Sequence, residues 1–204
     1  MNRPPQRRAP FALAFVFVLS CIAGCARSSE LTTEAKNCAC AEADAKLVDQ
    51  ALVAWLSKAR TLHHLADVAE TEGAVDQAIT PLEQLVDGSL PPGPPQEVSE
   101  VLADTYARMA ELRTRSGDFE RADRDVAAGL DRAPAATYFR GHLLEVRGLI
   151  YEKLSEKLER AGKHSEAKQV REKAIGASLE AVRIQDEVIK GALGDAGSAN
   201  KRDR

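Results

Sequence analysis

The sequence predicts an all-α protein, and three observations lead to this fold class. Aromatic residues make up only 4% of the 204 residues, which is low for a β-sandwich, while alanine, leucine and charged residues dominate. Apolar residues recur at steps of three and four over most of the chain after residue 41. Glycines 73, 117 and 162 divide this region at nearly equal intervals. We therefore expect about six helices, arranged as repeated helical hairpins.

The first 24 residues have the organisation of a secretion signal. Arg3, Arg7 and Arg8 form a positively charged start without an acidic residue, and residues 11–20 are apolar. This apolar run is too short to cross a bilayer as a resident helix. Residues 1–24 are therefore predicted to be a signal peptide that is removed from the mature chain.

The end of this segment, Ile-Ala-Gly-Cys at residues 22–25, resembles the lipobox of bacterial lipoproteins. The resemblance implies that the thiol of Cys25 receives a diacylglyceryl group and that cleavage occurs just before it. It further implies that the new amino group is acylated, with a fatty acid such as palmitate. Several acyl chains on one residue anchor a protein more firmly than a single chain does.

Two alternatives to this anchor are weaker. The first is an ordinary secreted protein that has a cysteine at residue 25. The second uses Cys21, but Leu19 is bulky where the lipobox has a small residue. Because Ala26 stands where an inner-membrane lipoprotein would carry aspartate, the resemblance implies the periplasmic side of the outer membrane.

Removal of residues 1–24 changes the charge of the chain. The 180 remaining residues carry 25 basic and 31 acidic side chains, so the net charge falls from −3 to −6. An acidic chain without a basic patch is a poor candidate for binding nucleic acid. Cys38 and Cys40 can be free, bonded to each other or bonded to a partner, and they are too few for a disulfide scaffold.

The mature chain divides into three parts. Residues 25–40 form a lipidated, flexible tether, residues 41–190 a helical domain and residues 191–204 a disordered tail. Helices are predicted over residues 41–73, 74–87, 97–116, 119–132, 137–161 and 165–190. Pro81 is expected to kink or fray the second helix. The proline-rich residues 88–96 form a stiff loop.

Other residues repeat at fixed distances from these three glycines. Alanine follows each glycine after five residues, and an aliphatic residue follows that alanine after eight. These positions are Ala78, Ala122 and Ala167, and Val86, Leu130 and Ile175. The alanine is expected to lie where the second helix crosses the first, and the aliphatic residue to seal the base of the hairpin.

This pattern resembles tetratricopeptide repeats over residues 58–179. The middle unit matches best, with Gly117, Phe119, Ala122, Leu130 and Pro134 at the turn, aromatic, crossing, aliphatic and closing positions. The period is ten residues longer than in standard repeats. The third unit departs from the pattern at Arg171 and Leu179. A six-helix antiparallel bundle with coincidental glycine turns is the alternative.

In tetratricopeptide arrays, partner peptides lie in the concave groove formed by the first helices of the units. The corresponding positions are Arg60, His63, Asp67, Glu70, Asp104, Ala107, Glu111, Arg115, Glu152, Glu156 and Glu159. The resemblance implies a groove rich in carboxylates that accepts a basic or amide-bearing extended segment. For each residue taken singly, a solvated helix surface is the alternative.

The sequence offers little chemistry for catalysis. It contains no glycine-rich phosphate loop, no His-Glu-x-x-His, no Gly-x-Ser-x-Gly and no Cys-x-x-Cys-His motif. His63 and His64 with Cys38 and Cys40 make a weak metal candidate, because adjacent helical side chains point about 100° apart. We therefore expect neither an enzyme nor a cofactor-binding protein.

The leading hypothesis is a membrane-anchored periplasmic lipoprotein that acts as an adaptor or scaffold for protein–protein interaction. Its expected partners are the membrane, through the lipid anchor, and an unidentified periplasmic or envelope protein. Envelope assembly, secretion or pilus systems are the settings considered. The alternatives are a metal- or cofactor-binding periplasmic protein and a purely structural helical-bundle lipoprotein.

Overall fold

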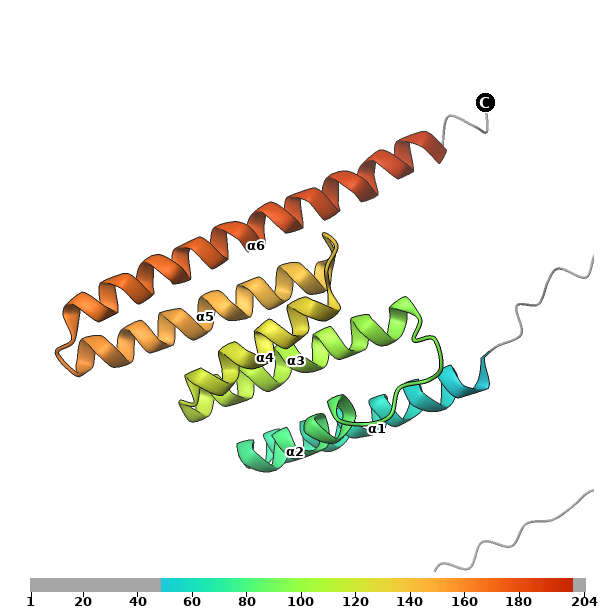
Figure 1. Cartoon of the computed structure of the whole chain (residues 1–204), viewed down its shortest axis with the longest axis horizontal. Helices are drawn as coiled ribbons and strands as arrows, with labels where there is room; N and C mark the ends of the chain where they lie inside the picture. The colour runs from blue at the N-terminus through green and yellow to red at the C-terminus, as the bar shows by residue number, and fades with distance from the viewer. Residues whose placement is uncertain (1–48, 200–204) are drawn as a thin grey trace, which may run out of the picture. The chain divides into compact units, whose positions relative to one another are not determined.

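The computed structural model describes residues 49–199, and this part of the chain is entirely helical apart from turns and loops (Figure 1). The predicted all-α fold class is confirmed. The helices are α1 (Gln50–Thr71), α2 (Val75–Val86), α3 (Gln96–Ser116), α4 (Phe119–Arg132), α5 (Tyr138–Arg160) and α6 (His164–Ala199). The predicted signal peptide, the lipidation site Cys25 and the predicted tether lie outside the described residues.

The first helix was predicted from residue 41, but α1 begins at Gln50, because Asp49 has an extended backbone and its side chain caps the helix. The other observed helices differ from the predicted ones in two places. The first is Pro81, which was expected to kink or fray α2. Instead, the helix continues beyond it to Val86, and the proline ring is buried. Ile79, Leu82 and Leu85 are buried on either side of the proline, so packing holds the helix where its backbone lacks one donor.

The second difference is at the end of α6. The helix was predicted to stop at residue 190, but it continues to Ala199, so residues 191–199 are not the disordered tail that was expected. Gly191 does not adopt a positive φ, and no proline follows it to end the helix. A glycine in helical geometry costs about 1 kcal/mol relative to alanine, which weakens a helix but does not end it.

The three hairpin turns share one geometry. Gly73, Gly117 and Gly162 all lie in the left-handed region, with φ of 77°, 82° and 74°. In each turn, the amide after the glycine donates to the carbonyl five residues earlier, as in a Schellman motif. These bonds are Ala74 N to Ala69 O, Asp118 N to Arg113 O and Lys163 N to Leu158 O, each 2.9 Å long. The predicted turns are therefore confirmed.

The positions that accompany the glycines behave as predicted in two hairpins and differ in the third. Ala78, Ala122 and Ala167 are all fully buried. Val86 and Leu130 pack against the core clusters of their hairpins. Ile175, however, is 55% exposed and seals nothing. It points away from α5, and Ala174 takes the buried position next to it.

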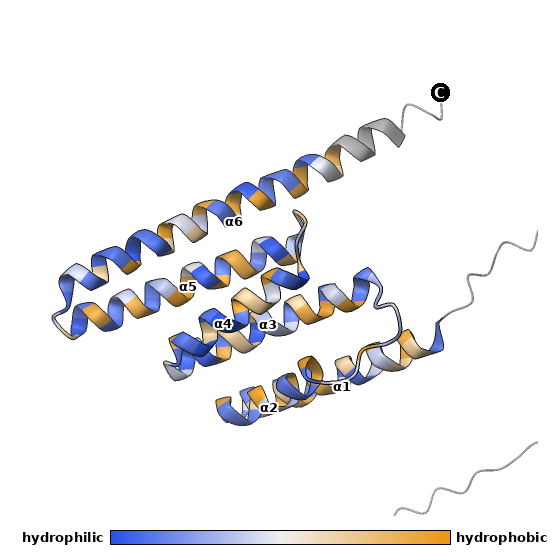
Figure 2. Cartoon of the chain, in the orientation of Figure 1, coloured by the Kyte–Doolittle hydropathy of each residue, from blue (hydrophilic) through white to orange (hydrophobic). Residues whose placement is uncertain are grey.

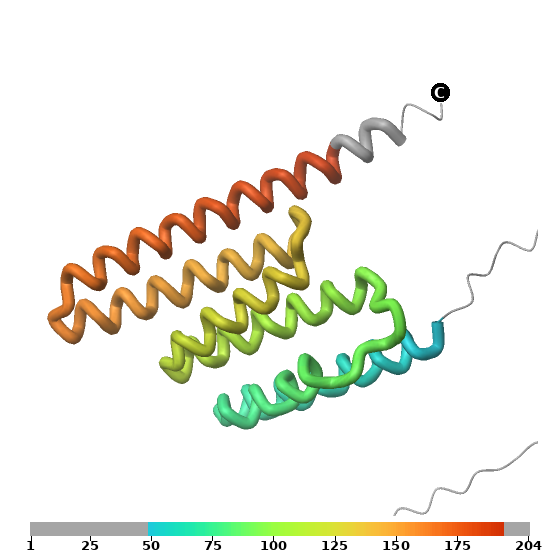
Figure 3. The backbone as a smooth tube through the Cα atoms, viewed as in Figure 1, coloured from blue at the N-terminus to red at the C-terminus, as the bar shows by residue number. Residues whose placement is uncertain are grey.

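The hairpins stack through their first helices. Consecutive helices run antiparallel, and α3 packs against both α1 and α5 (Figures 1 and 3). Helices α2 and α4 each pack on their own first helix and on the next one, whereas α6 contacts α5 alone. Helices α1, α3 and α5 therefore form one continuous layer. No helix between residues 49 and 199 combines the length and apolar character that a membrane span requires.

Candidate functional site

The predicted groove residues lie on α1, α3 and α5, and an arginine that the prediction omitted joins two of them. Arg108 on α3 forms ion pairs with Asp67 and Glu70 on α1, and its Nη2–Glu70 Oε2 distance is 3.0 Å. Arg115 donates to the other carboxylate oxygen of Glu70 at 2.7 Å. The first two hairpins are thus held together by a polar cluster of Asp67, Glu70, Arg108 and Arg115.

This cluster changes the electrostatics expected for the groove. The hydrogen bond from Arg115 holds the pKa of Glu70 below its ordinary value. The charged form of Glu70 is therefore favoured, and both Asp67 and Glu70 are already paired with guanidinium groups of the same chain. A basic partner segment would have to displace Arg108 and Arg115 to reach them.

His63 also links α1 to α3. Its Nε2 lies 2.9 Å from Oγ1 of Thr105, and the Thr105 hydroxyl donates to the carbonyl of Val101 at 2.6 Å. Because that hydroxyl proton is already used, Nε2 of His63 carries the proton that it donates to Thr105. Burial lowers the pKa of His63, so the neutral ring is favoured.

The other candidates on α1 and α3 have three different settings. Arg60 is exposed and Asp104 half-buried, and residues 49–199 supply no ion pair to either. Ala107 is fully buried among the core residues of α3, α4 and α5, so this predicted groove residue cannot contact a partner. Glu111 is half-buried, and burial raises the pKa of its carboxyl group although His142 and Arg115 oppose the shift.

A cleft of about 710 Å³ opens where α3 and α5 meet, next to the turn at Gly117. It is lined by Glu70, Glu111, Thr114, Arg115, Gly117, Phe119, Leu149, Lys153, Lys157 and Arg160. Four of these side chains are basic and two are acidic. Leu149 is 37% exposed and Phe119 is half-buried, so both offer apolar surface. The Lys157 ammonium lies 5.2 Å from the centroid of the Phe119 ring.

The three glutamates predicted on α5 do not line this cleft. Glu156 forms ion pairs with Lys153 at 2.9 Å and Arg160 at 3.3 Å, and so contacts two of the cleft's basic side chains. Glu159 pairs with His164 and Arg171 on α6. Glu152 is exposed, and the cleft lining does not include it. The three glutamates of α5 are therefore not part of the cleft that Glu70 and Glu111 line.

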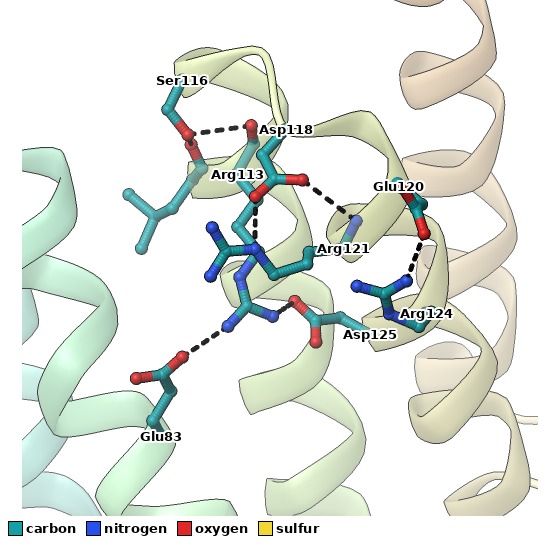
Figure 4. A network of polar contacts seen from close by, with 9 residues as sticks. Glu83, Arg113, Ser116, Asp118, Glu120, Arg121, Arg124 and Asp125 are labelled. Atoms are coloured by element: carbon teal, nitrogen blue, oxygen red, sulfur yellow. Dashed lines mark hydrogen bonds and ion pairs between the residues drawn. The ribbon is translucent and has the colours of Figure 1, made fainter.

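A second polar network, between α2, α3 and α4, was not anticipated from the sequence (Figure 4). Arg113 on α3 pairs with Glu83 on α2 at 2.5 Å and with Asp125 on α4. No buried side-chain polar atom in the described part of the chain lacks a hydrogen-bond partner. The network is therefore internally satisfied, and its role is to hold neighbouring helices in register.

The remaining chemical candidates give no site. Among residues 49–199, no three His, Cys, Asp or Glu side chains come together in a way that could hold a metal ion. His63 is bonded to Thr105, while Cys38 and Cys40 lie outside the described range. Comparison of the chain with protein-family models, with curated proteins and with solved structures gives no match.

Proposed function

We propose that this protein is a lipid-anchored periplasmic adaptor whose hairpins are tetratricopeptide-like units, and that it binds an extended segment of an envelope protein in the α3–α5 cleft. The observation that carries the proposal is the cleft itself, which is open to solvent and combines apolar with charged lining. The three turns of identical geometry support the repeat assignment. The lipobox resemblance at residues 22–25 supports the anchor.

The chemistry of the cleft favours an acidic segment over the basic one expected from the sequence. Glu70 is engaged by Arg108 and Arg115. Around the opening, Lys157 forms no ion pair within residues 49–199, and the side chains of Arg115, Lys153 and Arg160 are 45–76% exposed although each has a glutamate partner. A carboxylate of the partner would find several cationic donors there. An apolar side chain of the same segment would pack against Leu149 and Phe119.

Charge reversal in the cleft tests the binding site. A photo-crosslinking amino acid in place of Leu149, introduced in living cells, is expected to trap one defined envelope protein. The double variant Lys153→Glu/Lys157→Glu should abolish that product, because the cleft becomes acidic. The matched control Lys168→Glu/Lys173→Glu makes the same change of charge on α6 and should leave the product intact. An unchanged product in the cleft variant would exclude this site.

The anchor is tested separately. The variant Cys25→Ser should remove the acceptor of the lipid and move the protein from the membrane fraction to the soluble periplasmic fraction. Its helical circular-dichroism signal should be unchanged, because Cys25 lies far along the chain from α1. Processed protein that stays in the membrane fraction would contradict the anchor.

A further inference from the structure

The face of α6 that points away from α5 is a stripe of large apolar side chains in solvent. Its apolar members, with exposed fractions of 54–69%, are Ile175, Leu179, Val182, Ile189 and Leu193. Together with Asp186 they succeed one another at steps of four, three, four, three and four residues. This is the a/d spacing of a two-helix seam, in which every member faces the same partner. We call these six positions the α6 stripe.

Helix α5 covers the opposite face of α6. Ala174, Ala177, Ala181 and Ile184 are buried there. The close contacts of Gly148 with Ser178 and of Gly141 with Gln185 fix the antiparallel register of the two helices. In this register, α5 begins opposite the residues just before Ile189. The C-terminal part of α6 therefore extends past α5, as Figure 1 shows, and its apolar residues continue there (Figure 2).

An overhanging helix of this kind needs a partner. A short helical segment without tertiary packing is marginal in water, and here it carries Ile189 and Leu193 on its surface. Scattered exposed apolar side chains need no explanation, but five of them on one helix face, interrupted only by Asp186, do. The occupant must offer a helix with the same a/d spacing and the same length.

We propose that the occupant is a second copy of this chain, packed antiparallel through the two α6 stripes. The stripe is almost palindromic about residue 184. An antiparallel pair therefore places Ile175 against Leu193 and Leu179 against Ile189, while Val182 lies against Asp186. One surface that complements itself in this way produces a closed dimer with twofold symmetry.

Charge selects the antiparallel arrangement. A parallel pair would bring the two Asp186 carboxylates together inside an apolar seam, which is strongly unfavourable. In the antiparallel pair, each Asp186 lies beside Arg183 of the other copy. The Arg183 side chain is 64% exposed and makes only a 3.5 Å pair with Glu187, so it is free to reach across.

The size of the stripe agrees with a specific interface. It spans about 27 Å of helix at 1.5 Å per residue. Two such stripes packed together remove on the order of 1,000 Å² from water, which is the lower limit for a specific protein interface. The inference depends only on α6, so it stands or falls independently of the α3–α5 cleft.

Analytical ultracentrifugation of the full chain in density-matched detergent tests the dimer. We expect a concentration-dependent species of twice the chain mass. The variant Leu179→Asp/Ile189→Asp should be monomeric over the same concentration range. Its circular-dichroism spectrum should lose at most the signal of the overhanging end of α6, because the rest of α6 stays packed on α5. The control Leu65→Asp/Val68→Asp places the same charges on exposed apolar positions of α1 and should remain dimeric.

Cysteine crosslinking in membranes tests the antiparallel geometry. Leu179→Cys/Ile189→Cys should form a disulfide-linked dimer above the background of the parent chain, whereas Ile189→Cys alone should not. Strong crosslinking by Ile189→Cys alone would indicate a parallel pair and overturn the proposal. A monomer at all concentrations would overturn it as well. Oligomers larger than a dimer that disappear in Leu65→Asp/Val68→Asp would also overturn the proposal. Binding of vesicles through the α6 stripe without dimerisation would do the same.

Discussion

Arg113 on α3 and Asp125 on α4 form an ion pair that is almost completely buried, with side chains 9% and 10% exposed (Figure 4). The second nitrogen of the same guanidinium reaches Glu83 on α2. One arginine therefore connects helices of two consecutive hairpins. Burial raises the pKa of Asp125 although Arg113 opposes the shift, which reflects what it costs to remove a carboxylate from water.

Removal of the Asp125 carboxylate should destabilise the protein strongly. Asp125→Ala leaves Arg113 buried with only the half-exposed Glu83, and we expect a loss of about 3 kcal/mol in the free energy of unfolding. Urea denaturation measures it. The matched variant Glu120→Ala breaks the exposed pair with Arg124 and should cost less than about 1 kcal/mol. Equal losses in the two variants would show that the buried pair has no special role.

The hydroxyl of Ser178 on α6 leaves no room for a side chain at Gly148 on α5. A Cβ at residue 148 would lie 2.6 Å from Oγ of Ser178, while its next neighbour, the Ala174 carbonyl, is 3.5 Å away. In thermal melts, Gly148→Ala should therefore destabilise the wild type by about 1–2 kcal/mol. In a Ser178→Ala background the same change should be neutral or stabilising by up to about 1 kcal/mol, through helix propensity.

Gly176 provides the control for this double-mutant cycle. It lies on the same helix as Ser178, and nothing stands within 4 Å of a Cβ built on it. Gly176→Ala should thus raise stability in both backgrounds. If Gly148→Ala had the same effect with and without the Ser178 hydroxyl, the close contact would not be the reason for glycine there.

Glu70 and Glu111 should affect stability in opposite directions as the pH changes. The pKa of Glu70 is lowered in the fold by Arg115, so its contribution is present above the ordinary value of 4.5 and is lost as the pH falls through the lowered pKa. The pKa of Glu111 is raised by burial, so its contribution is present below 4.5 and is lost as the pH rises through the raised pKa.

Two glutamine variants separate these effects. At neutral pH, Glu70→Gln should unfold at a lower urea concentration than the wild type, and Glu111→Gln at a higher one. The difference from wild type should shrink on acidification for both variants. Measurement of the urea midpoint from pH 3 to pH 7 checks the signs. A loss of stability at neutral pH in Glu111→Gln would show that ionised Glu111 is a net stabiliser.

The sequence predicted the helices because their signals are local. The spacing of Gly73, Gly117 and Gly162 located the turns, and prolines marked the loop before α3. Helices α3, α4 and α5 begin and end within one residue of the predicted positions. The end of α6 was wrong, because Gly191 was interpreted as a stop although its backbone remains helical.

The site was harder to predict because its partners are distant in the sequence. Asp67 and Glu70 lie about 40 positions before Arg108, and no pattern within α1 shows that an arginine of α3 neutralises them. Arg108 does lie one helical turn from Asp104 and from Glu111, so its helix face could have been identified. Ile175 was expected to be buried by analogy with Leu130, but no further helix follows in the described range to cover it.

The pattern of contacts between the helices has a consequence for cooperativity. Within residues 49–199, the α1–α2 hairpin touches only α3, and α6 touches only α5. Stability in such an array is close to a sum of terms between neighbours. Either end can therefore open locally while the α3–α4 hairpin stays folded. The central hairpin therefore couples the stability of the α1–α2 hairpin to that of the α5–α6 hairpin. A mutation that unfolds the central hairpin would leave these two hairpins thermodynamically independent of each other.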